Sequence, residues 1–155
     1  MEIVIGELLI AQKQTLALAE SCTGGLISHW LTNVPGSSAY LVASVIAYAY
    51  EAKVAALGVA WETLNQYGAV SAETVTAMAR GVREKFSATI GIAVTGIAGP
   101  GGGTPDKPVG LTFIALAAPN DLQIEKHVWR GNRLENKTQS AHAALQLLKK
   151  YLENK

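Results

Sequence analysis

The chain has 155 residues, of which 49% are hydrophobic and 16% are charged. This length corresponds to one domain, and so apolar a composition excludes a disordered chain and a charge-rich coiled coil. Thirteen Lys and Arg residues against twelve Asp and Glu give a formal net charge of +1, so no overall positive field favours a nucleic acid or a membrane surface. We therefore expect one domain over residues 1–155 that binds neither.

Hydrophobic periodicity and turn residues predict alternating helices and strands along the chain. In chain order the expected elements are a helix at 3–13, a strand at 15–19, a helix at 24–33, a strand at 40–49, a helix at 51–57, a helical turn at 61–67, a helix from 71 to about 86, strands at 88–95, 110–118 and 122–129, and a helix from 132.

Most of the predicted strands are nearly continuous apolar runs, which is typical of strands covered by helices on both faces. The residues Pro119, Asn120 and Asp121 join the last two strands and favour a hairpin, which supplies an antiparallel part. The expected fold is therefore a three-layer α/β/α sandwich with a mixed, mostly parallel sheet.

The segment from Ala19 to Gly25, AESCTGG, lies where a buried strand ends and a helix begins. Ligands of α/β folds gather at such strand ends, and a helix N-terminus offers free N–H groups. The hydroxyls of Ser21 and Thr23 can therefore hold an anion. Simple capping of the helix explains the same residues equally well.

Two further segments have a structural explanation that is as simple as a functional one. The serines of Pro35-Gly36-Ser37-Ser38-Ala39 suit an ordinary turn. Lys53 is one of only two basic residues in the first 75. If it lies against buried strands, its pKa falls and it can act as a base toward a serine; otherwise it is a solvated surface residue.

A Gly/Pro-rich loop at 96–108 follows the strand at 88–95 and lacks both the phosphate-loop and the dinucleotide-binding fingerprint. A loop this long in a compact domain is usually functional and can present backbone N–H groups to a phosphate or a carboxylate. Residues 76–155 carry eleven basic and six acidic residues. This excess fits a small anionic ligand and also a solvated basic helix.

The single cysteine, Cys22, excludes an internal disulfide and a cysteine-based zinc site. We interpret it as a packed, inert thiol. The three histidines show no metal-ligand spacing, so neither a metal nor another cofactor is expected. The acidic start of the chain lacks the basic region of a signal peptide, which indicates a cytoplasmic protein.

Six motifs together resemble the C-terminal domain of the CinA family, the family of the bacterial nicotinamide mononucleotide deamidases. The motifs follow the family's order and spacing over nearly the whole chain: AESCTGG at 19–25, PGSSA at 35–39, Y-x-x-EAK at 48–53, LGV at 57–59, YGAVS at 67–71 and TGIAGPGGGTPDKPVG at 95–110. The resemblance implies an α/β/α sandwich and hydrolysis of the carboxamide of nicotinamide mononucleotide to nicotinate mononucleotide and ammonia.

The resemblance also implies serine–lysine chemistry without a metal. The catalytic positions would be Ser21, Ser38, Tyr48 and Lys53; we assign the nucleophile to Ser38, with Ser21 as the rival. The implied substrate-binding residues are Thr23, Gly24, Gly25, Thr95, Gly96, Gly99, Gly101, Gly102 and Arg133.

The chain departs from the family beside the lysine, where Ala49 and Tyr50 replace the usual Ser and Asn, and Lys137 replaces a second Arg. Ala49 and Tyr50 favour an alternative function, a non-catalytic domain that binds a nucleotide or a protein partner. The expected partners are a small nucleotide substrate and further copies of the chain. Tyr50 is expected to face away from the site, against a neighbouring helix or a second subunit.

Overall fold

The structure is a computed structural model covering residues 1–155, and it confirms the three-layer α/β/α sandwich. Its elements are α1 (Glu2–Ala11), β1 (Leu16–Glu20), α2 (Leu26–Thr32), the 3₁₀ turn η1 (Ser37–Ala39), β2 (Leu41–Ile46), α3 (Tyr50–Leu57), α4 (Trp61–Tyr67), α5 (Ala72–Lys85), β3 (Ile90–Gly96), β4 (Leu111–Ala118), β5 (Asp121–Val128) and α6 (Arg133–Glu153).

The five strands form one mixed sheet in the order β2-β1-β3-β4-β5. β1 pairs in parallel with both β2 and β3, whereas β4 is antiparallel to β3 and to β5. Only β4 therefore runs against the other four strands, as expected for a mostly parallel sheet with a terminal hairpin. The carboxyl ends of β1, β2 and β3 lie at one edge of the sheet.

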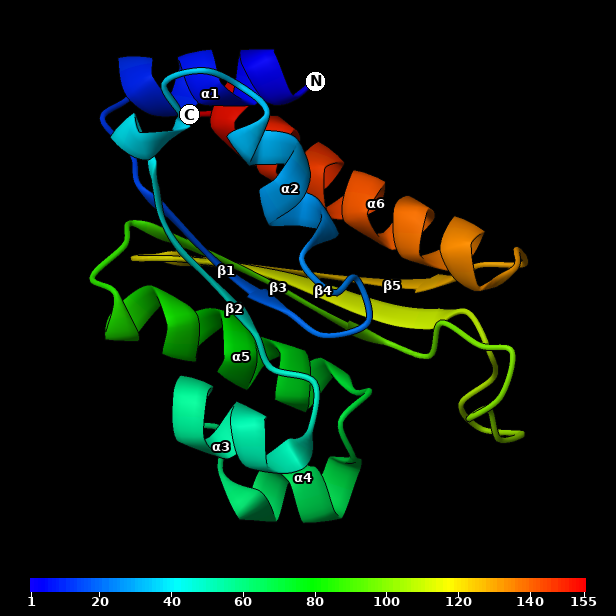
Figure 1. Cartoon of the computed structure of the whole chain (residues 1–155). Helices are drawn as coiled ribbons and strands as arrows, with labels where there is room; N and C mark the ends of the chain where they lie inside the picture. Colours follow the sequence, from blue (N-terminus) through cyan, green and yellow to red (C-terminus); the bar gives the residue numbers. More distant parts are fainter.

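Helices cover both faces of the sheet, with α1, α2 and α6 on one face and α3, α4 and α5 on the other (Figure 1). Each face has its own apolar core. Leu16 and Leu18 of β1 point into the first core, and Ala17 and Ala19 point into the second. This alternation is the period-2 geometry of a strand, and burial on both faces explains the continuous apolar run.

The structure confirms two of the predicted helix starts through their capping hydrogen bonds. The hydroxyl of Ser71 accepts a hydrogen bond from the Thr74 N–H at the start of α5. Asn132 and Glu135 form a reciprocal capping box at the start of α6. The predicted turn at 61–67 is a complete short helix, α4.

The strand expected at 40–49 is shorter than predicted, because β2 ends at Ile46. The Ala47 N–H donates to the carbonyl oxygen of Glu20, and the chain then turns away from the sheet into α3. This early departure brings α3 to the carboxyl end of β1. No helix of the structure combines the length and the apolar character that a bilayer crossing requires.

Candidate active site

Ser21 and Lys53 meet at the carboxyl end of β1. Ser21 is the first residue after the strand, and Lys53 lies in the first turn of α3. The Lys53 Nζ lies 3.1 Å from the Ser21 Oγ, 2.7 Å from the Ala47 carbonyl oxygen and 3.0 Å from the Tyr48 carbonyl oxygen. This contact is one of the two geometries expected for Lys53, which lies near a serine hydroxyl and not in solvent.

Lys53 is only 1% exposed and has no carboxylate within salt-bridge distance. Burial therefore lowers the pKa of Lys53 from 10.5 to about 8. As an ammonium, Lys53 donates to all three oxygens, and the same geometry also accommodates the neutral amine. Its two N–H groups match the two carbonyl oxygens, and its lone pair is left for the Ser21 hydroxyl proton.

Ser38 lies at the other end of the sheet, so the geometry of this chain does not support its assignment as the nucleophile. It is exposed in η1, directly before β2, whereas Lys53 lies beyond the other end of that strand. Six residues of strand separate the two ends by roughly 20 Å. The rival serine, Ser21, is the one within reach of the amine.

Tyr48 lies beside the Ser21–Lys53 pair but points toward α6 and the glycine-rich loop. Its hydroxyl accepts a hydrogen bond of 2.9 Å from the Arg133 guanidinium. The same guanidinium donates to the Gly99 carbonyl oxygen at 2.7 Å. Arg133 therefore joins three segments that are far apart in sequence, as a residue at the mouth of a site does.

The turn after β1 is not the open helix N-terminus that the sequence suggested. The buried carboxylate of Glu20 accepts hydrogen bonds from the N–H groups of Gly25, Ile27 and Ser28. The first N–H groups of α2 are therefore occupied, and they are not available to a ligand. The sequence signal for this role was an acidic residue six positions before the first residue of a helix.

Two N–H groups of the same turn remain free, those of Cys22 and Thr23, because neither donates to a backbone or side-chain oxygen. The Thr23 hydroxyl is also buried without a partner. Unpaired buried donors are costly. A bound group can satisfy the donors beside Ser21, so we include Thr23 with Ser21 in the candidate site.

Positive charge from α6 reaches this turn. Gly24 has a positive φ of 63°, and the Lys137 Nζ lies 3.5 Å from the place that a Cβ on Gly24 would occupy. Lys137 therefore lies over the turn, on the same face of α6 as Arg133, four residues earlier. The sequence identified Lys137 only as a replacement of the family's Arg.

The glycine-rich loop has both closely packed and open parts. Gly96 is closely packed, because a Cβ there would lie 2.7 Å from the Thr112 Oγ1. The Thr95 hydroxyl donates to the Ala69 carbonyl oxygen at 2.8 Å. Gly101 has open space around it, and Gly102 has a positive φ of 85°. Of these predicted binding residues, Thr95 and Gly96 hold the loop base, whereas Gly101 and Gly102 lie in its exposed part.

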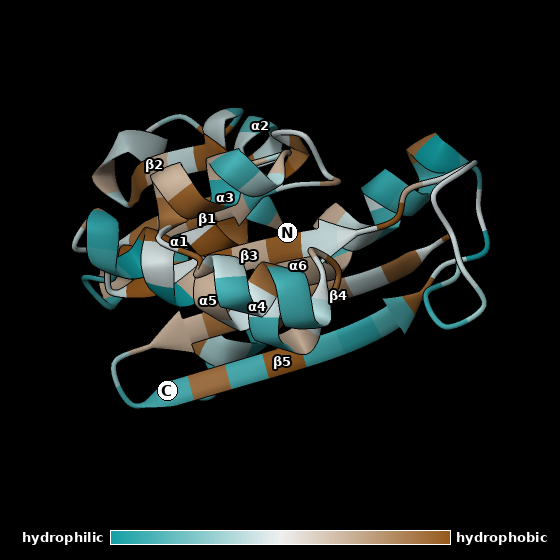
Figure 2. Ribbon diagram, turned by 90° about the horizontal axis from the view of Figure 1, so that it is seen from below, coloured by the Kyte–Doolittle hydropathy of each residue, from teal (hydrophilic) through white to brown (hydrophobic).

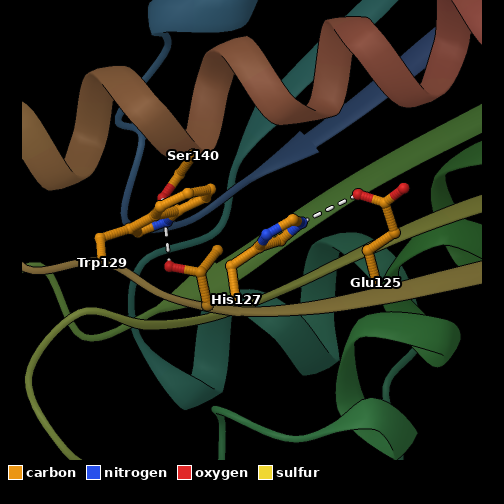
Figure 3. Close-up of polar contacts among 5 residues, drawn as sticks. Glu125, His127, Trp129 and Ser140 are labelled. Carbon is orange, nitrogen blue, oxygen red and sulfur yellow. Dashed lines mark hydrogen bonds and ion pairs between the residues drawn. The ribbon is translucent and has the colours of Figure 1, made fainter.

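A buried polar network holds the loop against α6. The Asn136 side chain donates to the Ala98 carbonyl oxygen and accepts from the Gly131 N–H. One turn later, the Ser140 hydroxyl accepts from the Trp129 indole N–H at 2.9 Å (Figure 3). These contacts fix the start of α6, which carries Arg133. Sequence reasoning missed Asn136, whose position inside a helix gave no signal.

Cys22 and Tyr50 lie as expected. Burial raises the pKa of the Cys22 thiol to about 12, which suits a packed, inert side chain. The Tyr50 hydroxyl accepts from the Ala69 N–H, and its ring lies 6.5 Å from that of Trp61 on α4. No three His, Cys, Asp or Glu side chains group as a metal site requires.

Known proteins share this sequence and fold. The chain matches the family described as the CinA C-terminal domain over residues 1–152. It is 52% identical over 155 residues to a CinA-like protein of Amoebophilus asiaticus and 49% identical over 151 residues to one of Desulforapulum autotrophicum. The matches cover 100% and 97% of the chain but only 37% and 36% of these relatives.

Solved structures agree over the whole chain. A competence-damaged protein (CinA) superfamily protein from Klebsiella pneumoniae superposes with a TM-score of 0.95 at 30% identity, covering 99% of this chain and 96% of that one. The competence/damage inducible protein CihA from Agrobacterium tumefaciens gives 0.89 at 39% identity, with coverages of 97% and 96%. The chain therefore belongs to the CinA C-terminal domain family.

Proposed function

We propose that this domain hydrolyses the carboxamide of nicotinamide mononucleotide, with Ser21 as the nucleophile and Lys53 as its base. The observation that carries the proposal is the buried contact of 3.1 Å between the Lys53 Nζ and the Ser21 Oγ. An uncompensated amine costs stability, and a base for an adjacent serine is the simplest chemical use of it.

In the first half of the reaction, the neutral amine of Lys53 takes the Ser21 hydroxyl proton while the Oγ attacks the carboxamide carbon. The lowered pKa of Lys53 leaves roughly a tenth of the amine neutral at pH 7. The resulting ammonium then gives its proton to the departing nitrogen, so that ammonia leaves and an ester with Ser21 remains. In the second half, the same amine takes a proton from a water molecule as the water attacks the ester carbon. The bond between this carbon and the Ser21 Oγ breaks, the ammonium returns its proton to the Oγ, and the acid product ionises to a carboxylate.

The free N–H groups of Cys22 and Thr23 suit the negative oxygen that forms during both halves. They directly follow the nucleophile in the chain, which is a common source of an oxyanion hole. The unpartnered Thr23 hydroxyl adds a third donor beside them. These are the donors that remain after the Glu20 carboxylate has capped α2.

Arg133 and Lys137 account for the preference for a nucleotide over the free base. Both cations project from one face of α6 toward the turn and the glycine-rich loop, where they suit a phosphate group. The exposed loop around Gly101 and Gly102 offers further N–H groups.

The test is ammonia release by the purified protein from nicotinamide mononucleotide, with free nicotinamide as the control substrate. Release from the nucleotide alone supports the proposal. Release from neither substrate, at protein concentrations where binding of the nucleotide is measurable by calorimetry, supports the second candidate.

That second candidate is a non-catalytic domain that binds a nucleotide or a protein partner. The observation favouring it is the segment before Lys53, where Ala49 and Tyr50 provide no side-chain donor to the site and the Tyr50 hydroxyl is engaged with Ala69. The competence-related names of the structural neighbours fit either candidate.

A further inference from the structure

One buried amide connects the glycine-rich loop with the start of α6. Asn136, in the first turn of α6, is 2% exposed. Its Nδ2 donates to the Ala98 carbonyl oxygen at 3.0 Å, and its Oδ1 accepts from the Gly131 N–H at 3.0 Å. A carbonyl oxygen only accepts and a backbone N–H only donates, so these two partners fix the orientation of the amide. The loop and the helix start lie at the end of the molecule toward which β5 points, and both are mostly white and teal in Figure 2.

The two hydrogen bonds of this amide support Arg133 from both sides. Gly131 lies two residues before Arg133, so the bond to Gly131 fixes the backbone from which the arginine projects. Ala98 lies next to Gly99, whose carbonyl oxygen accepts from the Arg133 Nη1 at 2.7 Å. The Asn136 side chain therefore holds both the main chain that carries the guanidinium and the loop segment that receives it.

Arg133 is held in place, and most of its donors remain available. The side chain is exposed, and no carboxylate lies within salt-bridge distance of it. Its two acceptors, the Gly99 carbonyl and the Tyr48 hydroxyl, are neutral groups. A guanidinium has five N–H donors, so the remaining donors and the full charge can meet an anion. An arginine that is already fixed loses less rotamer freedom when it binds a ligand than a mobile one does.

We propose that Asn136 is a positioning residue for nucleotide recognition, which holds Arg133 in advance where its guanidinium meets the phosphate group of the substrate. The inference rests on the proposed function for the identity of that substrate. Asn136 acts through Arg133 and contributes to binding of the phosphate, and not to the chemical step at Ser21. Leucine has the same branching as asparagine, so Asn136→Leu removes the donor and the acceptor and retains the shape of the side chain.

Steady-state kinetics separates binding from chemistry. In Asn136→Leu the KM for nicotinamide mononucleotide is expected to rise roughly three- to tenfold, the effect of one long side chain that must be immobilised on binding. The kcat is expected to stay within about twofold. Nicotinamide riboside, which lacks the phosphate, is the matched substrate, and its KM is expected to be unchanged. An equal rise in KM for both substrates, or a fall in kcat with an unchanged KM, would overturn the proposal.

Ser140→Ala is the matched control for a purely structural effect. Ser140 lies one turn later in the same buried network, where its hydroxyl donates to the Asn136 carbonyl oxygen and accepts from the Trp129 indole. It contacts neither the loop at Gly99 nor the backbone at Gly131. Its loss is expected to lower the free energy of unfolding and to leave the KM unchanged. A rise in KM equal to that of Asn136→Leu would show that general loosening of α6 explains both effects.

A double-mutant cycle tests whether Asn136 acts through Arg133. Calorimetric titration with nicotinamide mononucleotide in the Ser21→Ala background gives the Kd without turnover. Asn136→Leu is expected to raise this Kd roughly three- to tenfold. In Arg133→Met the same change is expected to have no further effect, because the guanidinium that it positions is absent. Equal rises with and without Arg133 would overturn the proposal.

The binding measurement also separates this inference from the proposed hydrolysis. Coupled Kd values without ammonia release by the unmodified chain would support the positioning role and contradict the hydrolysis. Ammonia release with uncoupled Kd values would do the reverse, and a chain that fails to bind the nucleotide at millimolar concentration would overturn both. Urea melts check that each variant folds. Asn136→Ser is the second variant if Asn136→Leu does not fold, because its short hydroxyl bonds only to carbonyl oxygens of its own helix, and the same rise in Kd is expected.

Discussion

Two serine-bearing segments of this chain look alike in sequence and differ in structure. AESCTGG and PGSSA each combine serine with glycine near a predicted strand. Ser21 lies at the carboxyl end of β1, buried beside an amine, whereas Ser38 lies exposed at the amino end of β2. Because β1 and β2 are parallel, the two serines lie at opposite edges of the sheet. Strand direction therefore decides which of the two serines lies within reach of the Lys53 amine.

The two ends of the sheet also differ in the destabilising polar groups that they bury. The Ser21 end contains a buried lysine without a carboxylate partner and unpaired donors at Cys22 and Thr23. The Ser38 end contains no buried lysine. Native structures retain such unfavourable features where function requires them, so the difference itself supports a site at Ser21.

Replacement of each serine by alanine, in separate variants, is expected to show the largest difference in activity. Ser21→Ala should lower kcat for ammonia release by about 10⁴-fold or more, since the nucleophile is lost. Ser38→Ala should stay within about twofold of the wild type, because an exposed turn residue lies far from the amine. Steady-state kinetics of the two matched variants decides. A loss of activity in Ser38→Ala but not in Ser21→Ala would contradict the assignment of Ser21 as the nucleophile.

Removal of the amine is expected to separate activity from stability. Lys53→Met should lower kcat by about 10²–10⁴-fold, the usual contribution of a general base. The same change removes a buried charge at neutral pH, so the free energy of unfolding in urea should rise. A variant that loses both activity and stability would show that Lys53 is mainly structural.

Both kcat/KM and the free energy of unfolding should depend on pH through Lys53. The proposed reaction needs the neutral amine, so kcat/KM should rise with pH and level off above about 8, where the pKa of Lys53 lies. The unfolded chain keeps this proton up to about pH 10.5, so between about 8 and 10.5 the unfolded state binds more protons and stability rises with pH. The gain is on the order of 3 kcal/mol. In Lys53→Met both rises should be absent.

Loss of the Glu20 carboxylate should lower the stability of the turn that follows β1 without changing the proposed reacting groups. Glu20→Ala leaves three N–H groups at the start of α2 without an acceptor. We expect a loss of about 2–4 kcal/mol in the free energy of unfolding. Glu51→Ala, at an exposed carboxylate in α3, should change it by less than about 0.5 kcal/mol. Equal losses in urea melts would contradict the capping role.

Tyr50→Asn is expected to have the smallest effect. The Tyr50 hydroxyl and ring contact Ala69 and Trp61, so kcat and KM should change by less than about twofold. The free energy of unfolding should fall by about 1 kcal/mol through the lost hydrogen bond. A several-fold gain in activity would instead indicate that position 50 faces the substrate.

The fold was predictable because its signals are local. Apolar runs marked the buried strands, and Ser71 and Asn132 marked two helix starts that the structure confirms. The early end of β2 was not predictable, since Ala47 and Tyr48 suit a strand equally well. Their departure depends on a hydrogen bond from Ala47 to Glu20, a residue of another strand.

The candidate site was predictable in its residue types but not in its partners. The sequence named both Ser21 and Lys53, yet it preferred Ser38 because no local pattern reports which strand end faces which helix. Glu20 and Asn136 were missed for a related reason. Their roles come from contacts with N–H and carbonyl groups of other segments, and such contacts leave no periodicity in the sequence.

The two carbonyl oxygens that hold the Lys53 amine have a consequence for the fate of its proton. Ala47 and Tyr48 fix two N–H directions, so a third proton on the amine points toward Ser21 alone. Burial keeps bulk water from this position. In the proposed reaction a proton taken from the serine is therefore stored next to the atoms that need it, and it is returned to the leaving nitrogen before it exchanges with solvent.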